Sequence, residues 1–225
     1  MIRQAVLMLV LLLSLGQGGA DRLADQTSLG GNLYLVNQTY RLTEHYRPPD
    51  LVRPAVCGAG SSILMREEAA KSLETMFAAA KEEGYQLVAI SGFRSYETQR
   101  VIYQRKIRTV GAAKAALLVA QPGSSEHQLG LAMDLGRKAS ANLNQAFGRS
   151  KEGQWVAQNA HRFGFIVRYK AEWTEVTGYA DEPWHIRYVG MAHAEEIVRR
   201  NIPLEEYAAE LAQHVYGEFL TDAAR

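Results

Sequence analysis

The sequence of 225 residues contains a single cysteine, Cys57, so internal disulfides are excluded. We expect this side chain to be a small buried apolar group, with a reactive thiol as the alternative. The main apolar run, Ala5–Leu15, is shorter than the roughly 20 residues that a transmembrane helix needs. Neither charge sign dominates, because 25 Lys and Arg residues are balanced by 24 Asp and Glu residues. A chain without a basic excess is poorly suited to nucleic acids or anionic membrane surfaces. We therefore expect no nucleic-acid partner.

The first 20 residues have the layout of an export signal. Arg3 is their only charge, the apolar run follows it, and residues 16–20 are rich in glycine and end in alanine, as before a cleavage site. The sequence therefore predicts a signal peptide over residues 1–20, with an N-terminal anchor or a buried helix as alternatives. Loss of Arg3 would leave 24 basic and 24 acidic residues, so the exported chain would carry no formal net charge.

The rest of the chain is predicted to form an N-terminal arm and one domain. Residues 21–60 are rich in Gly, Pro and Asn, which favours an arm that wraps around a core, whereas residues 61–225 have regular apolar spacing. Helices and short strands do not alternate regularly there, which predicts an α+β fold with a small, mostly antiparallel sheet and helices packed on it. The expected helices span residues 66–83, 96–108, 112–120, 153–162 and 191–217, with a break at 201–203, and the expected strands span 86–90, 130–135, 165–169 and 185–189.

Two of the six histidines lie among other polar residues and beside Gly, Pro or Trp: His127 and His185. Asp134 ends an apolar strand segment, where a buried acid needs a cationic partner. Two imidazoles and one carboxylate would give Zn²⁺ three protein ligands and leave the fourth position for water, as in catalytic zinc sites. Taken singly, each histidine could instead be a hydrogen-bonded structural residue, and Asp134 an ion-paired or turn-capping acid.

Two further charged residues complete the candidate reaction site. Glu182, three residues before His185, is well placed to take a proton from water and pass it to a leaving amine. Arg94, directly after an expected strand, is suited to bind a substrate carboxylate or to stabilise an oxyanion. Taken singly, Glu182 would be a solvated loop residue before Pro183, and Arg94 a surface cation.

Three motifs with fixed internal spacing occur in this order along the chain. Residues 91–95 read Ser-Gly-Phe-Arg-Ser. The pattern Ser-x-His-x-x-Gly-x-Ala-x-Asp is matched by Ser125, His127, Gly130, Ala132 and Asp134, and the pattern Glu-x-Trp-His-x-Arg by Glu182, Trp184, His185 and Arg187. Over about residues 33–208 the chain resembles the zinc D-alanyl-D-alanine carboxypeptidases, a family related to the vancomycin-resistance D,D-carboxypeptidases and bacterial L,D-carboxypeptidases. In that family the first motif usually has Tyr where this chain has Phe93.

The resemblance implies a role for each matched residue. It makes residues 61–225 a zinc peptidase catalytic domain, with a zinc site at the sheet. The zinc ligands would be His127, Asp134 and His185, and Glu182 would be the general base and acid. Arg94 would steady substrate or transition-state charge, and the substrate site would also be lined by Gln99, Ser125 and Trp184. This chain has Ala180 and Asp181 before the glutamate, where many relatives have an adjacent tyrosine, and the difference concerns substrate selectivity more than metal binding.

The function implied by the resemblance is an exported zinc carboxypeptidase that removes the C-terminal D-alanine from peptidoglycan stem peptides. It would act in the periplasm, or outside the cell at the cell wall, with no stable membrane insertion after signal cleavage. The alternatives on the same fold are an L,D-carboxypeptidase, a D,D-dipeptidase and a peptidoglycan endopeptidase. A non-catalytic cell-wall peptide-binding domain is a further alternative, but binding alone does not require a general base such as Glu182.

Overall fold

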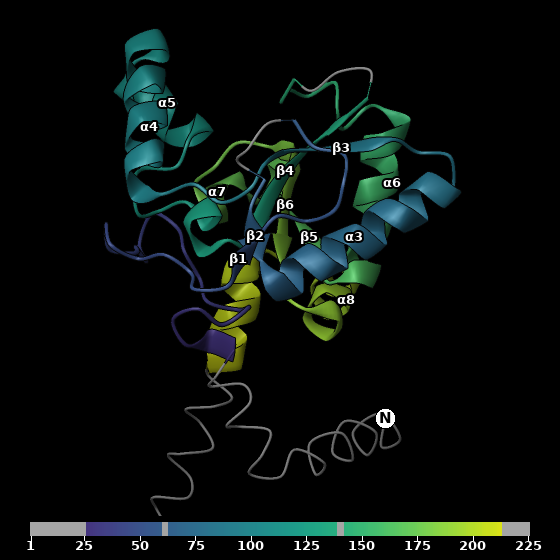
Figure 1. Ribbon diagram of the computed structural model, residues 1–225. Helices are drawn as coiled ribbons and strands as arrows, with labels where there is room; N and C mark the ends of the chain where they lie inside the picture. Colours follow the sequence, from purple (N-terminus) through teal and green to yellow (C-terminus); the bar gives the residue numbers. More distant parts are fainter. Residues whose placement is uncertain (1–25, 60–62, 139–141, 213–225) are drawn as a thin grey trace, which may run out of the picture. The chain divides into compact units, whose positions relative to one another are not determined.

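The computed structural model describes residues 26–59, 63–138 and 142–212 (Figure 1). The chain divides into two compact units. Of the described residues, 26–34 and 208–212 belong to the first unit, in which the Leu33 amide donates a hydrogen bond to the Gln26 carbonyl at 2.9 Å. The second, Leu35–Tyr207, contains the strands and helices named below. The expected signal peptide lies outside the described residues.

The second unit is built on a four-stranded antiparallel sheet with the strand order β3-β4-β6-β5. These strands are β3 (Leu87–Ser91), β4 (Ala132–Arg137), β5 (Phe165–Tyr169) and β6 (Glu182–Tyr188). A separate two-stranded antiparallel sheet joins β1 (Leu51–Val52) to β2 (Met65–Arg66). The α+β class and the antiparallel sheet predicted from the sequence are confirmed.

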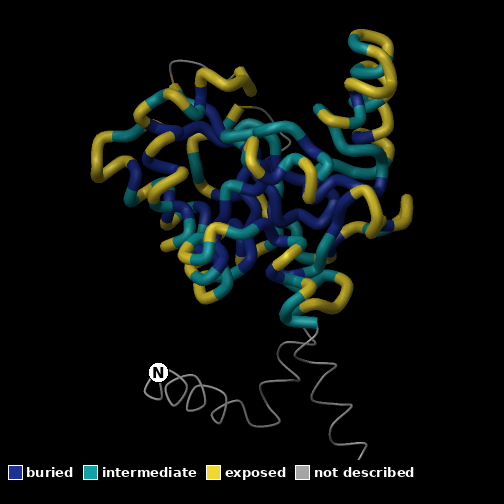
Figure 2. Tube along the Cα trace, turned by 180° about the vertical axis from the view of Figure 1, so that it is seen from behind, coloured by how far each residue is buried: buried dark blue, intermediate teal, exposed yellow. Residues whose placement is uncertain are grey.

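The two faces of the sheet have different chemistry. Because side chains alternate along a strand, Met133, Leu135, Ile186 and Tyr188 share one face, whereas Asp134, His185 and Arg187 share the other. Helices α3 (Glu67–Glu82), α6 (Lys151–Asn159) and α8 (Met191–Arg200) lie together on one side in Figure 1. The apolar face meets α3, where the Tyr188 hydroxyl donates to Glu68 at 2.7 Å. Asp134, His185 and Arg187 on the polar face are buried as well, and Figure 2 shows the buried segments in dark blue.

A helical hairpin, α4 (Tyr96–Val110) and α5 (Ala112–Leu118), projects from the sheet in Figure 1. Gly111 joins its two helices with a φ of 82°, a conformation that glycine adopts readily. Only Gln99 in α4 and Ala115 in α5 are buried. The remaining short helices are η1 (Glu126–Leu129), η2 (Ala160–Phe163), η3 (Ala171–Trp173) and α7 (Thr174–Thr177).

Three expectations about local structure need correction. Strand β6 begins at Glu182 rather than at residue 185, because a bulge places residues 183–185 opposite Arg168 and so accommodates Pro183, which has no N–H to donate. Helix α6 begins two residues before the expected start and ends at Asn159, where η2 takes over. Cys57 is exposed, because this edge segment is held by its backbone: the Ala89 amide donates to the Cys57 carbonyl at 2.8 Å.

Residues 42–59, part of the expected arm, are hydrogen-bonded to the core. The Leu42 amide donates to the Gly123 carbonyl at 2.8 Å, and the Gln128 side chain donates to the Thr43 carbonyl at 2.8 Å. The Asp50 carboxylate accepts from the Arg66 guanidinium of β2 at 3.0 Å. Among the described residues, no helix has both the length and the apolar character of a membrane span.

Candidate active site

The register of the sheet brings two of the predicted ligands together. Asp134 on β4 is directly opposite His185 on β6. His127 comes from η1, which Gly130 ends with a φ of 70° before the chain enters β4. A Cβ at Gly130 would lie 2.8 Å from Leu51, so this turn suits glycine on both counts. The glycine of the motif thus places His127 beside Asp134.

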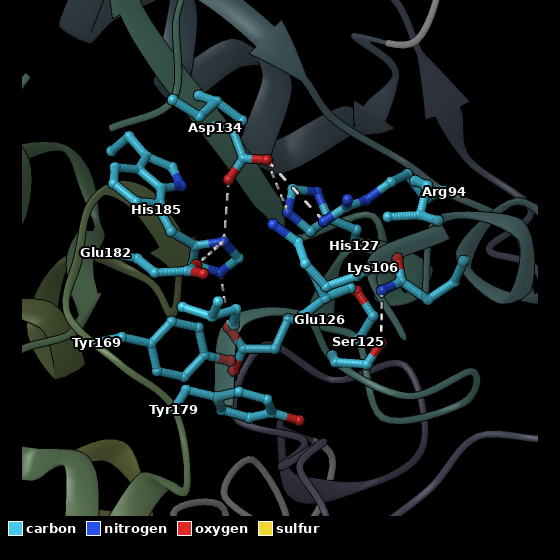
Figure 3. A pocket seen from close by; sticks show the side chains of 17 residues that line it. Arg94, Lys106, Ser125, Glu126, His127, Asp134, Tyr169, Tyr179, Glu182 and His185 are labelled. Carbon is cyan, nitrogen blue, oxygen red and sulfur yellow. Dashed lines mark hydrogen bonds and ion pairs between the residues drawn. The ribbon is translucent and has the colours of Figure 1, made fainter. Parts of the chain in front are cut away.

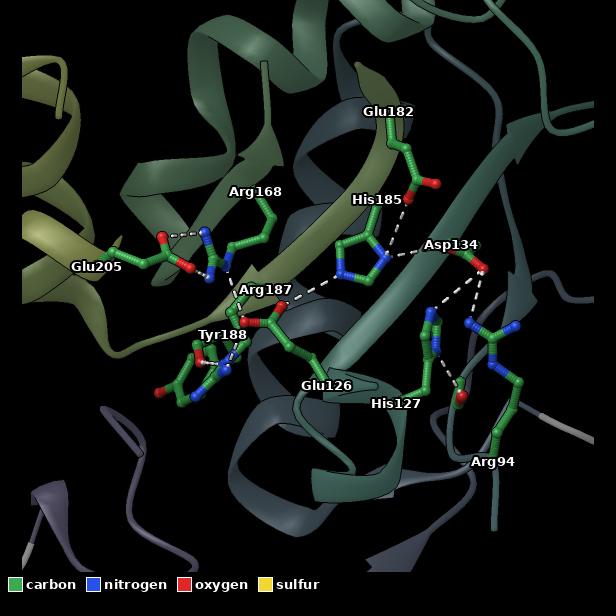
Figure 4. Close-up of polar contacts among 11 residues, drawn as sticks. Arg94, Glu126, His127, Asp134, Arg168, Glu182, His185, Arg187, Tyr188 and Glu205 are labelled. Carbon is green, nitrogen blue, oxygen red and sulfur yellow. Dashed lines mark hydrogen bonds and ion pairs between the residues drawn. The ribbon is translucent and has the colours of Figure 1, made fainter. Parts of the chain in front are cut away.

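The three side chains converge on one point (Figure 4). One Asp134 carboxylate oxygen is 3.1 Å from His185 Nδ1, and the other is 3.3 Å from His127 Nε2. One candidate ligand atom from each residue lies within 4.8 Å of the others. His127 Nε2 is buried and has no hydrogen bond to any described residue, so its lone pair is available to a metal. Two imidazole nitrogens and a carboxylate oxygen form a donor set that fits Zn²⁺.

Each histidine is held through its other ring nitrogen. His127 Nδ1 lies 2.7 Å from the Gly92 carbonyl oxygen, to which it can only donate. His185 Nε2 lies 3.3 Å from a carboxylate oxygen of Glu126. Such partners fix the tautomer of a metal-binding histidine and direct its free nitrogen toward the metal.

Burial and neighbouring charges shift the pKa values of all three groups. Burial, followed by the positive charge of Arg94, lowers the pKa of His127 to about 4. Burial alone would lower the pKa of His185, but hydrogen bonds to Asp134 and Glu126 raise it to about 9. Burial alone would raise the pKa of Asp134, yet the adjacent imidazoles, first His127 and then His185, hold it below its usual range. The carboxylate therefore stays ionised inside the protein.

Glu182 and Arg94 lie next to this cluster. One Glu182 carboxylate oxygen is 3.9 Å from His185 Nδ1, and burial raises the pKa of Glu182 to about 7. An Arg94 Nη atom is 3.9 Å from Asp134, and the Arg94 backbone amide donates to the His127 carbonyl at 3.2 Å. The buried Arg94 Nε has no hydrogen bond to any described residue. A base and a cation with a free donor thus lie on either side of the possible metal position.

A pocket of about 270 Å³ opens onto the cluster and contains all the predicted site residues (Figure 3). Gln99 donates to the Ala120 carbonyl at 2.7 Å, while its buried carbonyl oxygen has no hydrogen bond to any described residue. Ser125 and Trp184 also line the pocket. The sequence reasoning missed the two aromatic walls, Tyr169 and Tyr179, whose ring centroids are 5.0 Å apart, and the pocket-facing residues Ile102, Lys106, Leu118 and Leu143.

The sequence reasoning also missed a buried ionic cluster behind His185. It consists of Glu126, Arg168 and Arg187, which have fully buried side chains, and of Glu205, whose side chain is 12% exposed. A signal for it was present, because Arg168 interrupts the apolar strand segment over 165–169 just as Asp134 interrupts its own.

A family model described as D-alanyl-D-alanine carboxypeptidase (VanY) matches residues 62–191. "Putative carboxypeptidase YodJ" of Bacillus subtilis (strain 168) is 47% identical over 180 residues, which is 78% of this chain and 66% of that protein. The bifunctional D-Ala-D-Ala dipeptidase and D-Ala-D-Ala carboxypeptidase VanXYC of Enterococcus gallinarum is 35% identical over 187 residues, which is 81% of this chain and 96% of that protein. The chain spans 66% and 57% of the first two curated relatives that it matches.

Solved structures of carboxypeptidases are also similar to this chain. The LdcB LD-carboxypeptidase is 47% identical with a TM-score of 0.73, and the match covers 77% of this chain and 83% of that one. A vancomycin-resistance D,D-pentapeptidase VanY in complex with Zn(II) is 33% identical with a TM-score of 0.67, and the match covers 78% of this chain and 98% of that one.

Proposed function

Because the chain belongs to the VanY D-alanyl-D-alanine carboxypeptidase family, we propose that it is a zinc-dependent carboxypeptidase that removes C-terminal D-alanine from peptidoglycan stem peptides. The observation that supports this most directly is the geometry of the site. Three donor atoms lie within 4.8 Å of one another at the base of a pocket, with Glu182 beside them. Relatives named for D-Ala-D-Ala and a zinc-bound structural neighbour support the substrate and the metal.

In this proposal His127, Asp134 and His185 hold the zinc. When bound, zinc would act as a Lewis acid toward the scissile carbonyl and would make a water molecule acidic enough to attack it near neutral pH. Glu182 takes the proton from that water and donates it to the nitrogen of the departing D-alanine. The distance of 3.9 Å between a Glu182 carboxylate oxygen and His185 Nδ1, a proposed ligand atom, supports this role.

The other pocket residues bind and orient the peptide. Arg94 has an unpaired Nε–H among the described residues, which would donate to the substrate carboxylate or to the developing oxyanion. The free carbonyl oxygen of Gln99 would accept an N–H of the peptide, and Ser125 would supply a hydroxyl. Trp184 would form part of the wall against which the peptide packs.

A second candidate, an L,D-carboxypeptidase that removes the terminal D-alanine from a tetrapeptide stem, is favoured by one comparison. Identity to the LdcB LD-carboxypeptidase is 47%, against 33% for the D,D-pentapeptidase VanY. The two activities share the same zinc chemistry and differ in which bond the pocket presents to it. We also propose that residues 1–20 direct export, so that the catalytic domain, residues 61–225, acts outside the cytoplasm. The similarity to the LdcB LD-carboxypeptidase, whose structure is described in terms of peptidoglycan recognition, supports this location.

The test combines metal analysis with Glu182→Ala, assayed on a pentapeptide stem ending in D-Ala-D-Ala and on the corresponding tetrapeptide. We expect about one zinc per wild-type chain, and a kcat for the variant about 10²–10⁴ lower with zinc retained. Release of D-alanine from the pentapeptide supports the first candidate, and release from the tetrapeptide alone supports the second. Unchanged activity of Glu182→Ala would refute the role given to that residue.

A further inference from the structure

Glu126 lies behind His185, on the far side of its ring from Asp134 (Figure 4). Its side chain is fully buried, and one carboxylate oxygen is 3.3 Å from His185 Nε2. The other oxygen accepts hydrogen bonds from Arg168 Nε and from an Arg187 Nη atom, each at 2.8 Å. A single carboxylate therefore joins a candidate metal ligand to two buried guanidinium groups.

The cluster continues away from the pocket. Arg168 donates twice to Glu205, at 2.9 and 2.6 Å, in the two-pronged geometry that suits a guanidinium and a carboxylate. The Asn37 side chain donates to Glu205 at 3.4 Å. Two carboxylates and two guanidiniums balance in charge, so Glu126 remains anionic where an isolated charge would not be tolerated. Five segments that are far apart in the sequence contribute to this cluster.

This arrangement has a specific effect on His185. An imidazole can offer Nδ1 to a metal only when its remaining proton is on Nε2. A permanently ionised acceptor at Nε2 favours that tautomer, fixes the plane of the ring and makes Nδ1 a stronger donor to a metal. Apolar residues of similar volume would stabilise a core at least as well as a buried ion cluster, so stability alone does not account for these four charges.

We propose that Glu126 is a positioning residue for His185: it fixes the ring and the tautomer for metal binding, and Arg168 and Arg187, which donate to it directly, hold Glu126 in place. This inference rests on the zinc site of the proposed function. It adds a residue outside the three ligands, Glu126, whose loss weakens metal binding without removing a donor atom.

The experiment compares Glu126→Gln with Glu205→Gln in the full chain. Both substitutions remove one carboxylate charge from the same cluster, but only Glu126 contacts His185. Zinc affinity is measured by competition with a chelator, and the visible absorption of the Co²⁺-loaded protein reports the ligand geometry. We expect about 10–100-fold weaker zinc binding and an altered Co²⁺ spectrum for Glu126→Gln. For Glu205→Gln we expect the wild-type spectrum and an affinity within about threefold of wild type.

Equal zinc affinity and spectra in wild type and Glu126→Gln would overturn the proposal, and so would equal losses in both variants, because these would indicate a general effect on the core. If Glu126→Gln does not fold, Glu126→Asp tests the proposal instead. This variant keeps the negative charge between the arginines, but its side chain is one methylene shorter and so holds His185 less closely. We expect it to bind zinc about tenfold more weakly, and wild-type affinity would overturn the proposal. A wild-type protein that binds zinc but cleaves no stem peptide would refute the proposed function. The comparison of Glu126→Gln with Glu205→Gln would then still test the role of Glu126 in zinc binding. A wild-type protein that binds no zinc would overturn both.

Discussion

The two candidate zinc-binding histidines are held in different ways. His127 is held by a neutral backbone carbonyl, that of Gly92, at 2.7 Å. His185 is held by a carboxylate, that of Glu126, whose charge is balanced by arginines. Their pKa values move in opposite directions, to about 4 for His127 and to about 9 for His185. One cluster therefore contains a histidine that burial keeps neutral and one that its acidic neighbours would protonate in the absence of metal.

The difference shows which part of the molecule fixes the orientation of each imidazole ring. The hold on His127 depends on the backbone path of the loop after β3, so a side-chain substitution cannot remove the acceptor. The hold on His185 depends on side chains from several segments, and each can be lost by mutation. The following three predictions test this contrast, beginning with the largest expected effect.

The largest effects are expected from removing each histidine. Both His127→Ala and His185→Ala should lose stoichiometric zinc, because each removes a ligand. In the metal-free state His185→Ala should lose about 3–5 kcal/mol of unfolding free energy, because it removes the donor shared by two buried carboxylates. His127→Ala should lose about 1–3 kcal/mol, the cost of an unsatisfied buried carbonyl. Zinc content is measured on the purified proteins, and the free energy of unfolding is measured with urea in the presence of a chelator. Equal destabilisation by the two substitutions would contradict the difference between the two histidines.

A smaller effect is expected from Gly92→Ala, which disturbs the backbone that holds His127. A Cβ there would collide with the Leu64 carbonyl oxygen and would lie 3.0 Å from Met133 Cε. The loop has to move, which should cost about 1–3 kcal/mol and weaken zinc binding. Gly84→Ala is the matched control, because Gly84 has a positive φ of 86° but nothing within 4 Å of an added Cβ. It should lose stability and keep zinc affinity, and wild-type zinc affinity in Gly92→Ala would show that the carbonyl does not position His127.

The smallest effect is expected at the outer end of the ionic cluster. Asn37 donates to Glu205 at 3.4 Å, and its side-chain oxygen accepts from the Thr39 and Tyr40 amides at 2.9 and 3.0 Å. Asn37→Ala should cost about 1 kcal/mol through these lost hydrogen bonds. Its zinc affinity should equal that of wild type, because Glu205 still pairs with Arg168. A large loss of zinc affinity would mean that the hold on His185 extends to residue 37.

The sequence was sufficient to predict the antiparallel sheet and the grouping of the site residues. Asp134 stood out because a carboxylate in an apolar strand needs a partner, and the motif spacing linked it to His127. Gly130 is expected at the start of a strand, but it lies in the turn between η1 and β4. The pairing of Asp134 with His185 depends on the sheet register, which the structure supplies.

The sequence was not sufficient to predict the ionic cluster. Glu126 is 42 residues from Arg168 and 61 from Arg187, and no local pattern specifies which buried charges meet at such separations. The early start of β6 depends on a bulge opposite Arg168, which is a property of two paired strands and not of either strand alone. The residue type predicts a buried Cys57, but the side chain is exposed and its segment contacts the core through the backbone.

The α4–α5 hairpin has an evolutionary consequence. It supplies Gln99, Ile102, Lys106 and Leu118 to the pocket, yet only one residue in each of its helices is buried. Substitutions along it therefore meet few packing constraints, whereas substitutions around the buried candidate ligands meet many. Changes in the hairpin can therefore alter the pocket and leave His127, Asp134 and His185 in place. We expect the members of this family to differ more in the hairpin than in the strands that carry Asp134 and His185.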